Sequence, residues 1–429
     1  MKICVVGSGA REHCLAVSFA KFSNSVVVTP GNPGIDEAYK SLQISTSTLD
    51  PTDIEADLFV IGPEGPLSEG ISDKLRGQGK IVFGPGKDGA QLESSKIWMK
   101  NVLKEASIPT ARFGEFKEFE PAKDFLNTLK DGYVIKTDGL AAGKGVFVTR
   151  QFDSALRDLK DKMEGKSFGQ AGRKVVIEEL MEGRELSVMA LTDGKNIVPL
   201  TPAVDAKRCF DNDEGPNTGG MGAFSPAEFI DDRTLDLVLE KCIEPILGVF
   251  KSRDINYRGV LYAGLMLTNE GPKIVEFNVR FGDPETQAIL PLLDTDLASL
   301  IYQAASGKLT EEPKFNRNKT VNIVLSAHGY PDSPQLGDKI YFDDDITDLE
   351  PGDVKLYFAG VAKNPDDEGL FTNSGRVLSV SSTKGTFKEA REAAYDQISK
   401  ISFDKMHFRS DIGKVAVEIE SQKQNSKLL

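Results

Sequence analysis

Three side chains in the run VEFNVRF have the types and the spacing needed to hold a metal ion with a polyphosphate. Glu276, Asn278 and Arg280 occupy alternate positions at and beyond the end of an expected strand. Alternate residues point to the same face, so the carboxylate and the amide project together, and the guanidinium joins them if the strand continues. Magnesium prefers a few hard oxygen ligands plus nucleotide phosphates, and arginine suits a charged phosphoryl group. The triplet therefore predicts a metal–nucleotide site rather than a solvent-facing strand edge.

A second segment, GLAAGKG at residues 139–145, contains three glycines and Lys144. It is similar to a phosphate-binding loop, but its spacing is one residue short of a Walker A motif and Gly145 stands where Ser or Thr is required. Because the segment lies between two expected strands, no helix N-terminus is present to hold phosphate. We interpret it as a hairpin lid that closes over a polyphosphate, with glycines that allow close backbone approach.

The first expected strand ends in Gly7-Ser8-Gly9, a turn that also occurs in dinucleotide-binding folds. The third glycine of the G-x-G-x-x-G fingerprint would fall at Glu12, whose carboxylate would repel a pyrophosphate at the helix N-terminus. The second strand also runs into Thr29-Pro30 rather than into an acidic partner for a ribose. The turn therefore argues against an oxidoreductase. Two interpretations stay open, a single-phosphate site assisted by Arg11 and a plain tight turn.

The elements that must position these residues begin with a parallel sheet. Four apolar runs near the N-terminus end in glycine-rich turns and alternate with helical patterns, which predicts an α/β domain with ligand-facing turns at the carboxyl ends of its strands. Beyond them we expect a long helix, two strand pairs, a polar glycine-dense loop, a second helix, two more strands, a final helix and a frayed polar tail. Their expected ranges are 93–106, 133–148 and 174–191, 205–225, 235–251, 259–267 and 272–277, 388–399, and 420–429.

Length and composition limit the number of domains and the classes of function that the chain can have. A length of 429 residues favours two to four domains. The net charge of −13 argues against a nucleic-acid-binding surface over most of the molecule, although local cations can still bind anions. The four cysteines form no CxxC pair, and none of the three histidines lies at zinc-ligand spacing from them, which argues against a zinc site. No apolar run reaches the length of a membrane helix, and the N-terminus does not read as a signal peptide, so we expect a cytoplasmic protein.

Several longer runs resemble the ATP-grasp superfamily and, within it, the phosphoribosylamine–glycine ligase family. The match covers essentially the whole chain, and its most specific parts are GPNTGGMGA and EFNVRFGDPETQ. It also rests on GSGAREH, PGNPG, IKTDGLAAGKGV, VVIEELMEGRE, YRGVLYAGLML and TNSGRVLSV. The resemblance implies an α/β (α+β) ATP-grasp fold with an N-terminal parallel α/β substrate-binding domain, an ATP-grasp domain with a lid subdomain, and a small mixed C-terminal domain. The implied ranges are 1–100, 101–295 with the lid at about 112–192, and 296–429.

The same resemblance implies a reaction. ATP would drive ligation of glycine to 5-phosphoribosylamine through glycyl phosphate, giving glycinamide ribonucleotide, ADP and phosphate in purine biosynthesis. It implies ATP with Mg²⁺ or Mn²⁺, small-molecule substrates, no nucleic-acid or membrane partner, and a monomer or weak homodimer. Two alternatives stay open: an ATP-grasp ligase with a different acceptor, and a nucleotide-binding protein without turnover.

Carried over by position, the resemblance assigns three groups of residues. Nucleotide contacts would come from Lys96, Lys136, Lys144, Glu178, Glu179, Leu180 and Glu185. Glu276 and Asn278 would bind the metal, and Arg280 and Asp205 would act in catalysis. The substrates would contact Gly9, Arg11, Glu12, Glu64, Asp213, Asn217, Thr218, Gly219 and Met221.

Three departures from the usual pattern concern the metal and the acceptor. Gly264 stands near the point where many ATP-grasp enzymes carry another acidic metal ligand, so a second metal would rest largely on nucleotide oxygens and Glu276. Val204 and Ala206 replace polar residues of a usual Gln-Asp-x-Lys-Arg run, and Ala10 replaces a usual glycine. These changes leave the expected ATP site intact and bear on how the acceptor or glycine is handled.

Overall fold

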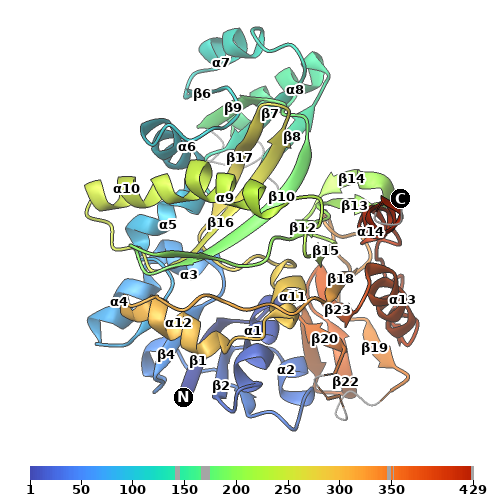
Figure 1. Cartoon of the computed structure of the whole chain (residues 1–429). Coiled ribbons are helices and arrows are strands. Elements are labelled where there is room, and N and C mark those ends of the chain that lie inside the picture. The colour runs from blue at the N-terminus through green and yellow to red at the C-terminus, as the bar shows by residue number, and fades with distance from the viewer. Residues whose placement is uncertain (141–144, 166–173, 345–348, 351, 427–429) are drawn as a thin grey trace.

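The computed structural model describes residues 1–140, 145–165, 174–344, 349–350 and 352–426 (Figure 1). Lys144, one of the predicted nucleotide contacts, lies outside these residues. Among the described residues, no helix is both long and apolar enough to span a membrane. The architecture is mixed α/β, as predicted, with one parallel sheet and several antiparallel ones.

The N-terminal sheet is parallel, with strand order β3-β2-β1-β4-β5. All residues of β4 and all but the first of β1 are buried, as expected for strands covered by helices on both faces. Helices α1 (Ala10–Ala20) and α3 (Glu64–Glu69) begin just beyond the carboxyl ends of β1 and β4, where the predicted glycine turns lie. The strands are β1 (Lys2–Gly7), β2 (Ser25–Pro30), β3 (Ile44–Thr46), β4 (Leu58–Ile61) and β5 (Val82–Phe83).

The single long helix predicted over residues 93–106 is wrong, because the chain forms α5 (Lys87–Ser94) and α6 (Lys96–Glu105) with a break at Ser95. Ser95 is extended, with φ −132° and ψ 114°, and its hydroxyl accepts a hydrogen bond from the Trp98 N–H. Serine is a strong N-cap because its oxygen satisfies an otherwise unpaired N–H. The break places Lys96 at the start of α6.

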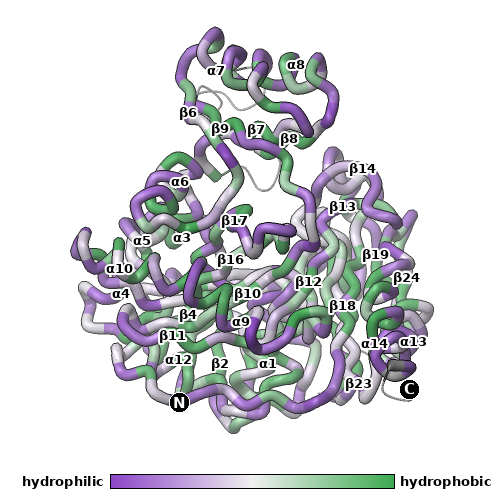
Figure 2. Tube along the Cα trace, turned by 45° about the horizontal axis from the view of Figure 1, so that its top comes forward, coloured by the Kyte–Doolittle hydropathy of each residue, from purple (hydrophilic) through white to green (hydrophobic). Residues whose placement is uncertain are grey.

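A four-stranded antiparallel sheet, order β6-β9-β7-β8, forms the lid. The predicted hairpin is confirmed, since β7 pairs antiparallel with β8, while its tip falls outside the described residues. The lid has a small core of its own and stands apart from the rest, with α7 and α8 over its outer face (Figures 1 and 2). Its elements are β6 (Phe113–Phe116), α7 (Phe119–Leu126), β7 (Tyr133–Thr137), β8 (Val146–Thr149), α8 (Phe152–Met163) and β9 (Val175–Glu179).

The central antiparallel sheet has the order β11-β10-β16-β17 and contains both strands predicted over 259–277. A bulge beside Gly264 lets two residues of β17 face one residue of β16. The predicted helix over 235–251 begins earlier, at Asp232, and a π-helical turn divides it. The elements are β10 (Arg184–Thr192), β11 (Ile197–Pro199), α9 (Asp232–Val238), the π-helical turn (Leu239–Ile243), α10 (Glu244–Ser252), β16 (Gly259–Thr268) and β17 (Gly271–Asn278).

The segment 205–225, predicted as a polar loop, is partly built into sheets. A hairpin of β13 (Arg208–Phe210) and β14 (Glu214–Asn217) projects from it. The short strands β12 (Val204–Asp205) and β15 (Gly222–Ser225) then extend a C-terminal sheet of order β12-β15-β18-β23-β20. The partners are β18 (Lys319–Ser326), β20 (Val354–Phe358) and β23 (Arg376–Lys384). The middle of the chain is thus hydrogen-bonded to its C-terminal part.

Two helices complete the C-terminal part, and one of them corrects a prediction. The predicted final helix is confirmed as α13 (Phe387–Ile398). In the tail predicted to fray, the described residues 420–426 instead continue α14 (Lys414–Ser426), which packs against α13, and residues 427–429 lie outside the described residues. Ala416 is 2% exposed, and the Glu420 carboxylate accepts a hydrogen bond from the Phe387 N–H at 3.0 Å. These contacts hold the segment in place, although its polar composition alone does not predict an ordered helix.

Candidate active site

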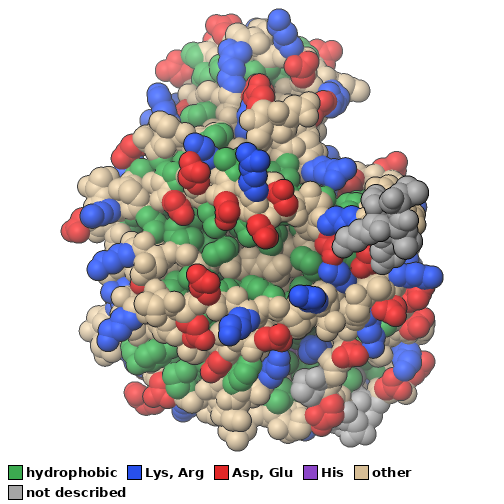
Figure 3. All heavy atoms as spheres, in the orientation of Figure 1, with side chains coloured by type: hydrophobic (Ala, Val, Ile, Leu, Met, Phe, Trp, Pro, Cys, Tyr) green, Lys and Arg blue, Asp and Glu red, His purple; other side chains and the backbone are tan. Residues whose placement is uncertain are grey.

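A cleft of about 1360 Å³ lies between the lid, the central sheet and the β13–β14 hairpin. Figure 3 shows the hollow beneath the lid, with acidic and basic side chains interspersed over that face of the molecule. Most of the predicted site residues line this one cleft, whereas Gly9, Glu12 and Met221 do not. Those that do are Arg11, Glu64, Lys96, Lys136, Glu178, Glu179, Leu180, Glu185, Asp205, Asp213, Asn217, Thr218, Gly219, Glu276, Asn278 and Arg280.

At the lid end of the cleft, a buried carboxylate is held between two lysines. The Lys136 Nζ lies 3.0 Å from the Glu178 Oε1 and donates to the Val275 carbonyl at 2.9 Å. Burial alone would raise the pKa of Glu178, but Lys136 and Lys100 outweigh it and lower that pKa. Glu178 is therefore charged and fixes the position of Lys136.

Sequence reasoning missed Lys100, the second lysine of this group. Its side chain is fully buried, its Nζ lies 3.0 Å from the Glu178 Oε1, and it donates to the Thr110 hydroxyl at 2.7 Å. Burial lowers the pKa of Lys100 to about 8, although Glu178 opposes the shift. One feature of the sequence could have identified Lys100. It lies between Met99 and Val102 on α6, on the face that the spacing of apolar residues predicts to be buried.

We expect Lys100→Met to raise the KM for ATP by about tenfold, because a hydrogen bond to a charged group contributes roughly 1.5–3 kcal/mol. The change removes one of the two cations that orient Glu178. Lys100 also loses its proton as pH rises through about 8, so the KM of the parent protein should rise between pH 7 and pH 9 while that of Lys100→Met stays flat. Initial rates at varied ATP test this, with the exposed Lys104→Met on the same helix as control. Parallel pH curves for the parent and Lys100→Met would contradict it.

The remaining predicted nucleotide contacts lie where the lid joins the central sheet. The Lys96 Nζ donates to the Gly139 carbonyl at 3.1 Å, next to the hairpin tip. The Glu179 carboxylate accepts the Arg112 N–H at 2.9 Å, and Glu185 pairs with Lys207 at 3.1 Å. Leu180 packs so close to Gly132, which has φ +145°, that a Cβ there would lie 2.7 Å from the leucine. These predicted nucleotide contacts form the wall of the cleft where the lid joins the central sheet.

The two candidate metal ligands project from the end of β17. Glu276 lies opposite Gly264 in the sheet, and a Cβ built at Gly264 would be 3.2 Å from the Glu276 Cγ. The glycine thus leaves room for the Glu276 side chain. Burial would raise the pKa of Glu276, but the cations Lys207, Lys136 and Lys96 lower it overall. A charged carboxylate beside the Asn278 amide suits a divalent cation.

The protein supplies few ligands of its own to such an ion. Among the described residues, no group of three or more His, Cys, Asp or Glu side chains could hold a metal. Glu276 and Asn278 therefore fit an ion whose other ligands are phosphate oxygens and water, as magnesium usually has when it binds with a nucleotide.

Arg280 lies beyond the end of β17, so the strand does not continue to it, yet its side chain still reaches Asn278 of the metal pair. Its Nη2 lies 2.9 Å from the Glu93 Oε1 and 3.1 Å from the Asn278 Oδ1, and its Nε lies 3.4 Å from the Glu64 Oε2. Burial opposes the charge, but Glu93 and Glu64 raise the pKa of Arg280. The guanidinium is fixed and charged beside the position expected for the metal.

Glu93, on α5, is a further residue that sequence reasoning missed. Its second oxygen accepts the Val279 N–H at 2.8 Å, so it holds both the backbone and the side chain of the segment after β17. Burial raises the pKa of Glu93 despite the neighbouring Arg280. No spacing in the sequence links residue 93 to residue 280.

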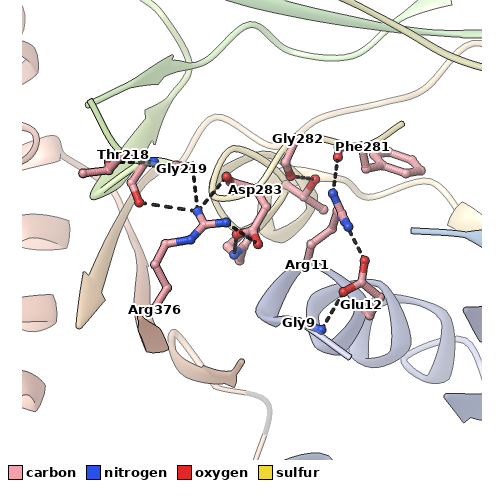
Figure 4. A network of polar contacts seen from close by, with 12 residues as sticks. Gly9, Arg11, Glu12, Thr218, Gly219, Phe281, Gly282, Asp283 and Arg376 are labelled. Carbon is pink, nitrogen blue, oxygen red and sulfur yellow. Dashed lines mark hydrogen bonds and ion pairs between the residues drawn. The ribbon is translucent and has the colours of Figure 1, made fainter. Parts of the chain in front are cut away.

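The glycine turn after β1 is closed by Glu12 itself (Figure 4). The Glu12 carboxylate accepts the Gly9 N–H at 2.6 Å and the Arg11 Nε–H at 2.5 Å. A Cβ at Gly62 would lie 2.0 Å from the same carboxylate. Glu12 thus fills the space that a pyrophosphate would need, which agrees with the argument against a dinucleotide. Arg11 also donates to the Phe281 carbonyl at 3.1 Å, so its guanidinium is largely engaged by protein.

Asp205 is half-buried at the centre of the cleft and lies against a group of buried polar side chains. The Ser187 hydroxyl contacts the Asp205 and Glu285 carboxylates, each at 3.5 Å, and the Tyr262 hydroxyl at 2.9 Å. The Tyr262 hydroxyl in turn donates to Glu285. Burial raises the pKa of Asp205 to about 8; Lys207 opposes this shift, and Glu285 adds to it. A carboxyl group that titrates near neutral pH can exchange protons in catalysis.

The stability of the fold should depend on pH through Asp205. Its pKa is raised from 3.8 to about 8 on folding, so its ionisation is favoured in the unfolded chain and disfavoured in the folded one. The destabilisation therefore grows as pH rises from about 4 to about 8 and stays constant above that. Asp205→Asn should raise the melting temperature more at pH 9 than at pH 5. Thermal melts with the exposed Asp404→Asn as control test this, and a gain that is equal at both pH values would contradict it.

The predicted acceptor residues are held by the C-terminal part of the chain. The Gly219 N–H donates to the Tyr330 hydroxyl at 2.9 Å, and the Arg376 Nη1 donates to the Gly219 carbonyl at 2.7 Å. At the hairpin tip, Asp213 pairs with Arg409 at 2.7 Å. Tyr330, Arg376, Arg409 and Asp283 line the cleft as well, and none was among the predicted site residues. Asp283 lies within EFNVRFGDPETQ, one of the two most specific runs, and Arg376 lies within TNSGRVLSV, on which the resemblance also rests.

Met221, like Gly9 and Glu12, is a predicted substrate contact that does not line the cleft. Its side chain is completely buried, and its N–H donates to the Ala206 carbonyl at 2.8 Å. It packs beneath the acceptor segment rather than in the cleft.

Three comparisons with known proteins agree with this geometry. Family models described as the N, ATP-grasp (A) and C domains of phosphoribosylglycinamide synthetase match residues 1–93, 94–286 and 320–415. The phosphoribosylamine–glycine ligase of Caldanaerobacter subterraneus is 40% identical over 420 residues, covering 96% of this chain and 99% of that protein. A crystal structure of the Thermotoga maritima phosphoribosylamine–glycine ligase superposes with a TM-score of 0.84 at 34% identity, covering 96% of this chain and 100% of that one.

A more distant likeness concerns the fold alone. The biotin carboxylase of Campylobacter jejuni is 14% identical and has a TM-score of 0.69, covering 97% of this chain and 95% of that one. The fold and the cleft together define an ATP-grasp enzyme. Within that class, the chain belongs to the phosphoribosylglycinamide synthetase family, which confirms the resemblance seen in the sequence.

Proposed function

We propose that this protein ligates glycine to 5-phosphoribosylamine at the expense of ATP, forming glycinamide ribonucleotide, ADP and phosphate in purine biosynthesis. One observation carries the proposal: Lys136, Glu276 and Arg280 share a single cleft with the acceptor segment 213–219. A carboxylate is a poor acyl donor, so ATP first converts glycine to glycyl phosphate, and the amine then attacks the acyl carbon. The likeness to named phosphoribosylamine–glycine ligases supports this choice of substrates.

Residues at different places in the cleft carry out different parts of this reaction. Lys96 and Lys136 bind the polyphosphate, and Glu178 holds Lys136 in place. Arg280, fixed by Glu93, neutralises charge on the transferring phosphoryl group. Glu276 and Asn278 would hold Mg²⁺ or Mn²⁺, which would neutralise phosphate charge. The ionised form of Asp205, whose pKa is about 8, accepts a proton as the amine attacks.

The further assignments that accompany this function are also proposals. We propose domains at 1–100, 101–295 and 296–429, a monomer or weak homodimer, and a cytoplasmic location. Lys144 would contact the nucleotide phosphates. Glu64, Asn217 and Thr218 would contact the substrates.

A ligase of the same class with a different acceptor is the second candidate. The observation that favours it is that Val204 and Ala206 both line the cleft, where the usual pattern of the family has polar residues. A change from polar to apolar side chains at a wall of the site alters which acceptor groups can be hydrogen-bonded.

An omission assay separates these candidates. ADP release is measured with ATP, glycine and 5-phosphoribosylamine, then with each substrate left out in turn, and the product is identified by mass. The proposed function requires that ADP and glycinamide ribonucleotide form in equal amounts only in the complete mixture. ADP release with another acid and amine, but not with these, would overturn the choice of substrates. ATP binding without turnover on any substrate would indicate a nucleotide-binding protein.

A further inference from the structure

The segment that follows the metal pair is held from two opposite sides by arginines. Figure 4 shows Arg11, from the N-terminal part, and Arg376, from the C-terminal part, approaching residues 281–283 from either side. Arg11 donates to the Phe281 carbonyl at 3.1 Å, and Arg376 donates to the Asp283 carbonyl at 2.8 Å. The Arg376 guanidinium also pairs with the Asp283 carboxylate at 3.1 Å. Residues 281–283 directly follow Arg280, so their position decides where the phosphoryl-binding guanidinium lies.

Arg376 makes a second set of contacts, to the acceptor segment. Its Nη1 donates to the Gly219 carbonyl at 2.7 Å and approaches the Gly220 carbonyl at 3.4 Å. The same planar guanidinium therefore bridges two segments that are far apart in the sequence. Arginine suits this role because its donors have a fixed geometry, which the single ammonium of a lysine lacks.

The two bridged segments also touch each other directly. A Cβ at Gly220, where φ is +108°, would lie 2.3 Å from the Pro284 Cδ, and a Cβ at Gly219 would lie 3.0 Å from the Arg376 Cζ. Only residues without side chains allow this close approach. The side chains of Arg376 and Asp283 are 23% and 16% exposed, so water screens their pairing only in part.

We propose that Arg376 is a positioning residue that aligns the acceptor segment 218–220 with the phosphoryl-transfer segment 280–283, so that the acyl phosphate forms beside a correctly placed amine. The inference rests on the proposed function. Without this alignment, the glycyl phosphate meets water instead. Water adds to the acyl carbon, the bond from that carbon to the phosphate oxygen breaks, phosphate leaves with the electron pair, and a proton passes to solvent. ATP is then consumed and no amide forms.

The test is the ratio of ADP to glycinamide ribonucleotide in Arg376→Met, a variant that keeps side-chain length but has no donors. We expect the KM for 5-phosphoribosylamine to rise by about tenfold or more and the ratio to rise from one to two or more, with the KM for ATP within about twofold. Arg376→Lys retains the charge beside Asp283 but cannot reach all the carbonyls, so it should give intermediate values.

A matched control separates positioning from general stability. Arg76 also donates to two backbone carbonyls, those of Val82 and Gly84 at 3.1 and 2.6 Å, but it lies outside the lining of the cleft. Arg76→Met should lower the melting temperature and leave the ADP-to-product ratio at one. If Arg376→Met does not fold, Arg376→Lys decides the question.

The outcomes are distinct. An unchanged ratio and an unchanged KM for 5-phosphoribosylamine in Arg376→Met, or in Arg376→Lys if only that variant folds, would overturn the positioning role. An equal rise in the KM for ATP and for the acceptor would do the same, because it would indicate general damage. Absence of product from the parent protein would overturn the proposed function, and this inference with it.

Discussion

Glu276→Gln is expected to lower ligase turnover by about a thousandfold, because the change removes the charged metal ligand while keeping its size and shape. The surrounding cations Lys207 and Lys136 lower the pKa of Glu276, so the parent side chain is ionised at neutral pH. Glutamine is neutral and coordinates a divalent ion weakly. The measurement is ADP release at saturating ATP, glycine and 5-phosphoribosylamine, together with a titration of Mg²⁺ and Mn²⁺. The metal concentration for half-maximal rate should rise as well.

The chain offers a control on the same hairpin. Glu270 lies in the turn between β16 and β17, is 77% exposed and pairs only with Lys273 among the ion pairs at that turn. Glu270→Gln makes the same chemical change on the surface and should leave turnover within about twofold, because exposed pairs contribute little. Circular dichroism and melting curves should show both variants folded. Turnover of Glu276→Gln within tenfold of the parent at saturating metal would refute the metal assignment.

Arg280→Lys should lower kcat by about 100- to 1000-fold and change the KM for ATP by less than about threefold. The guanidinium contacts Glu93 and Asn278 through Nη2 and Glu64 through Nε, and a single lysine ammonium cannot occupy both nitrogen positions. Charge is retained, so neither Glu93 nor Glu64 is left without a cation nearby. The loss should therefore fall on the transition state, where the phosphoryl charge develops, rather than on nucleotide binding.

Steady-state rates and ATP affinity, measured on the same preparation, test whether the loss falls on kcat and not on the KM for ATP. Arg150→Lys is the control, since Arg150 forms an exposed pair with Glu182 on the lid and its replacement should alter neither parameter. A rise in the KM for ATP as large as the fall in kcat would place Arg280 in ground-state binding instead. A variant that melts far below the parent would be judged by the ratio of kcat to KM at low temperature.

The sequence was sufficient for features that depend on local spacing. The alternation of Glu276 and Asn278 predicts a shared face, and both line the cleft because β17 is a strand through Asn278. The glycine turns after β1 and β4 mark the carboxyl ends of a parallel sheet, as found. The position of Glu12 argues against a dinucleotide, and its carboxylate fills the turn. In each case the prediction depends only on a short sequence spacing or on one side chain.

What could not be predicted depends on contacts between distant segments. Glu93 and Lys100 lie on helices, but they fix Arg280 and Glu178 only because α5 and α6 pack against the central sheet and the lid. The break between those helices follows from the Ser95 cap, which the apolar pattern does not reveal. Arg376 is 157 residues from Gly219. No regular spacing in the sequence relates residues so far apart, so only the folded structure shows that they are in contact.

The pairing of β15 with β18 has a consequence for a chain that is still being synthesised. The strands of the lid and the central sheet end by residue 278, and they already carry Lys136, Glu178 and Glu276. The acceptor segment precedes that point in the sequence, but its supports, Tyr330, Arg376 and Arg409, emerge from the ribosome later. Domains generally fold as units from the N-terminus during translation. The nascent protein should therefore become able to bind a nucleotide before it can hold an acceptor, and a chain released early would lack the second ability.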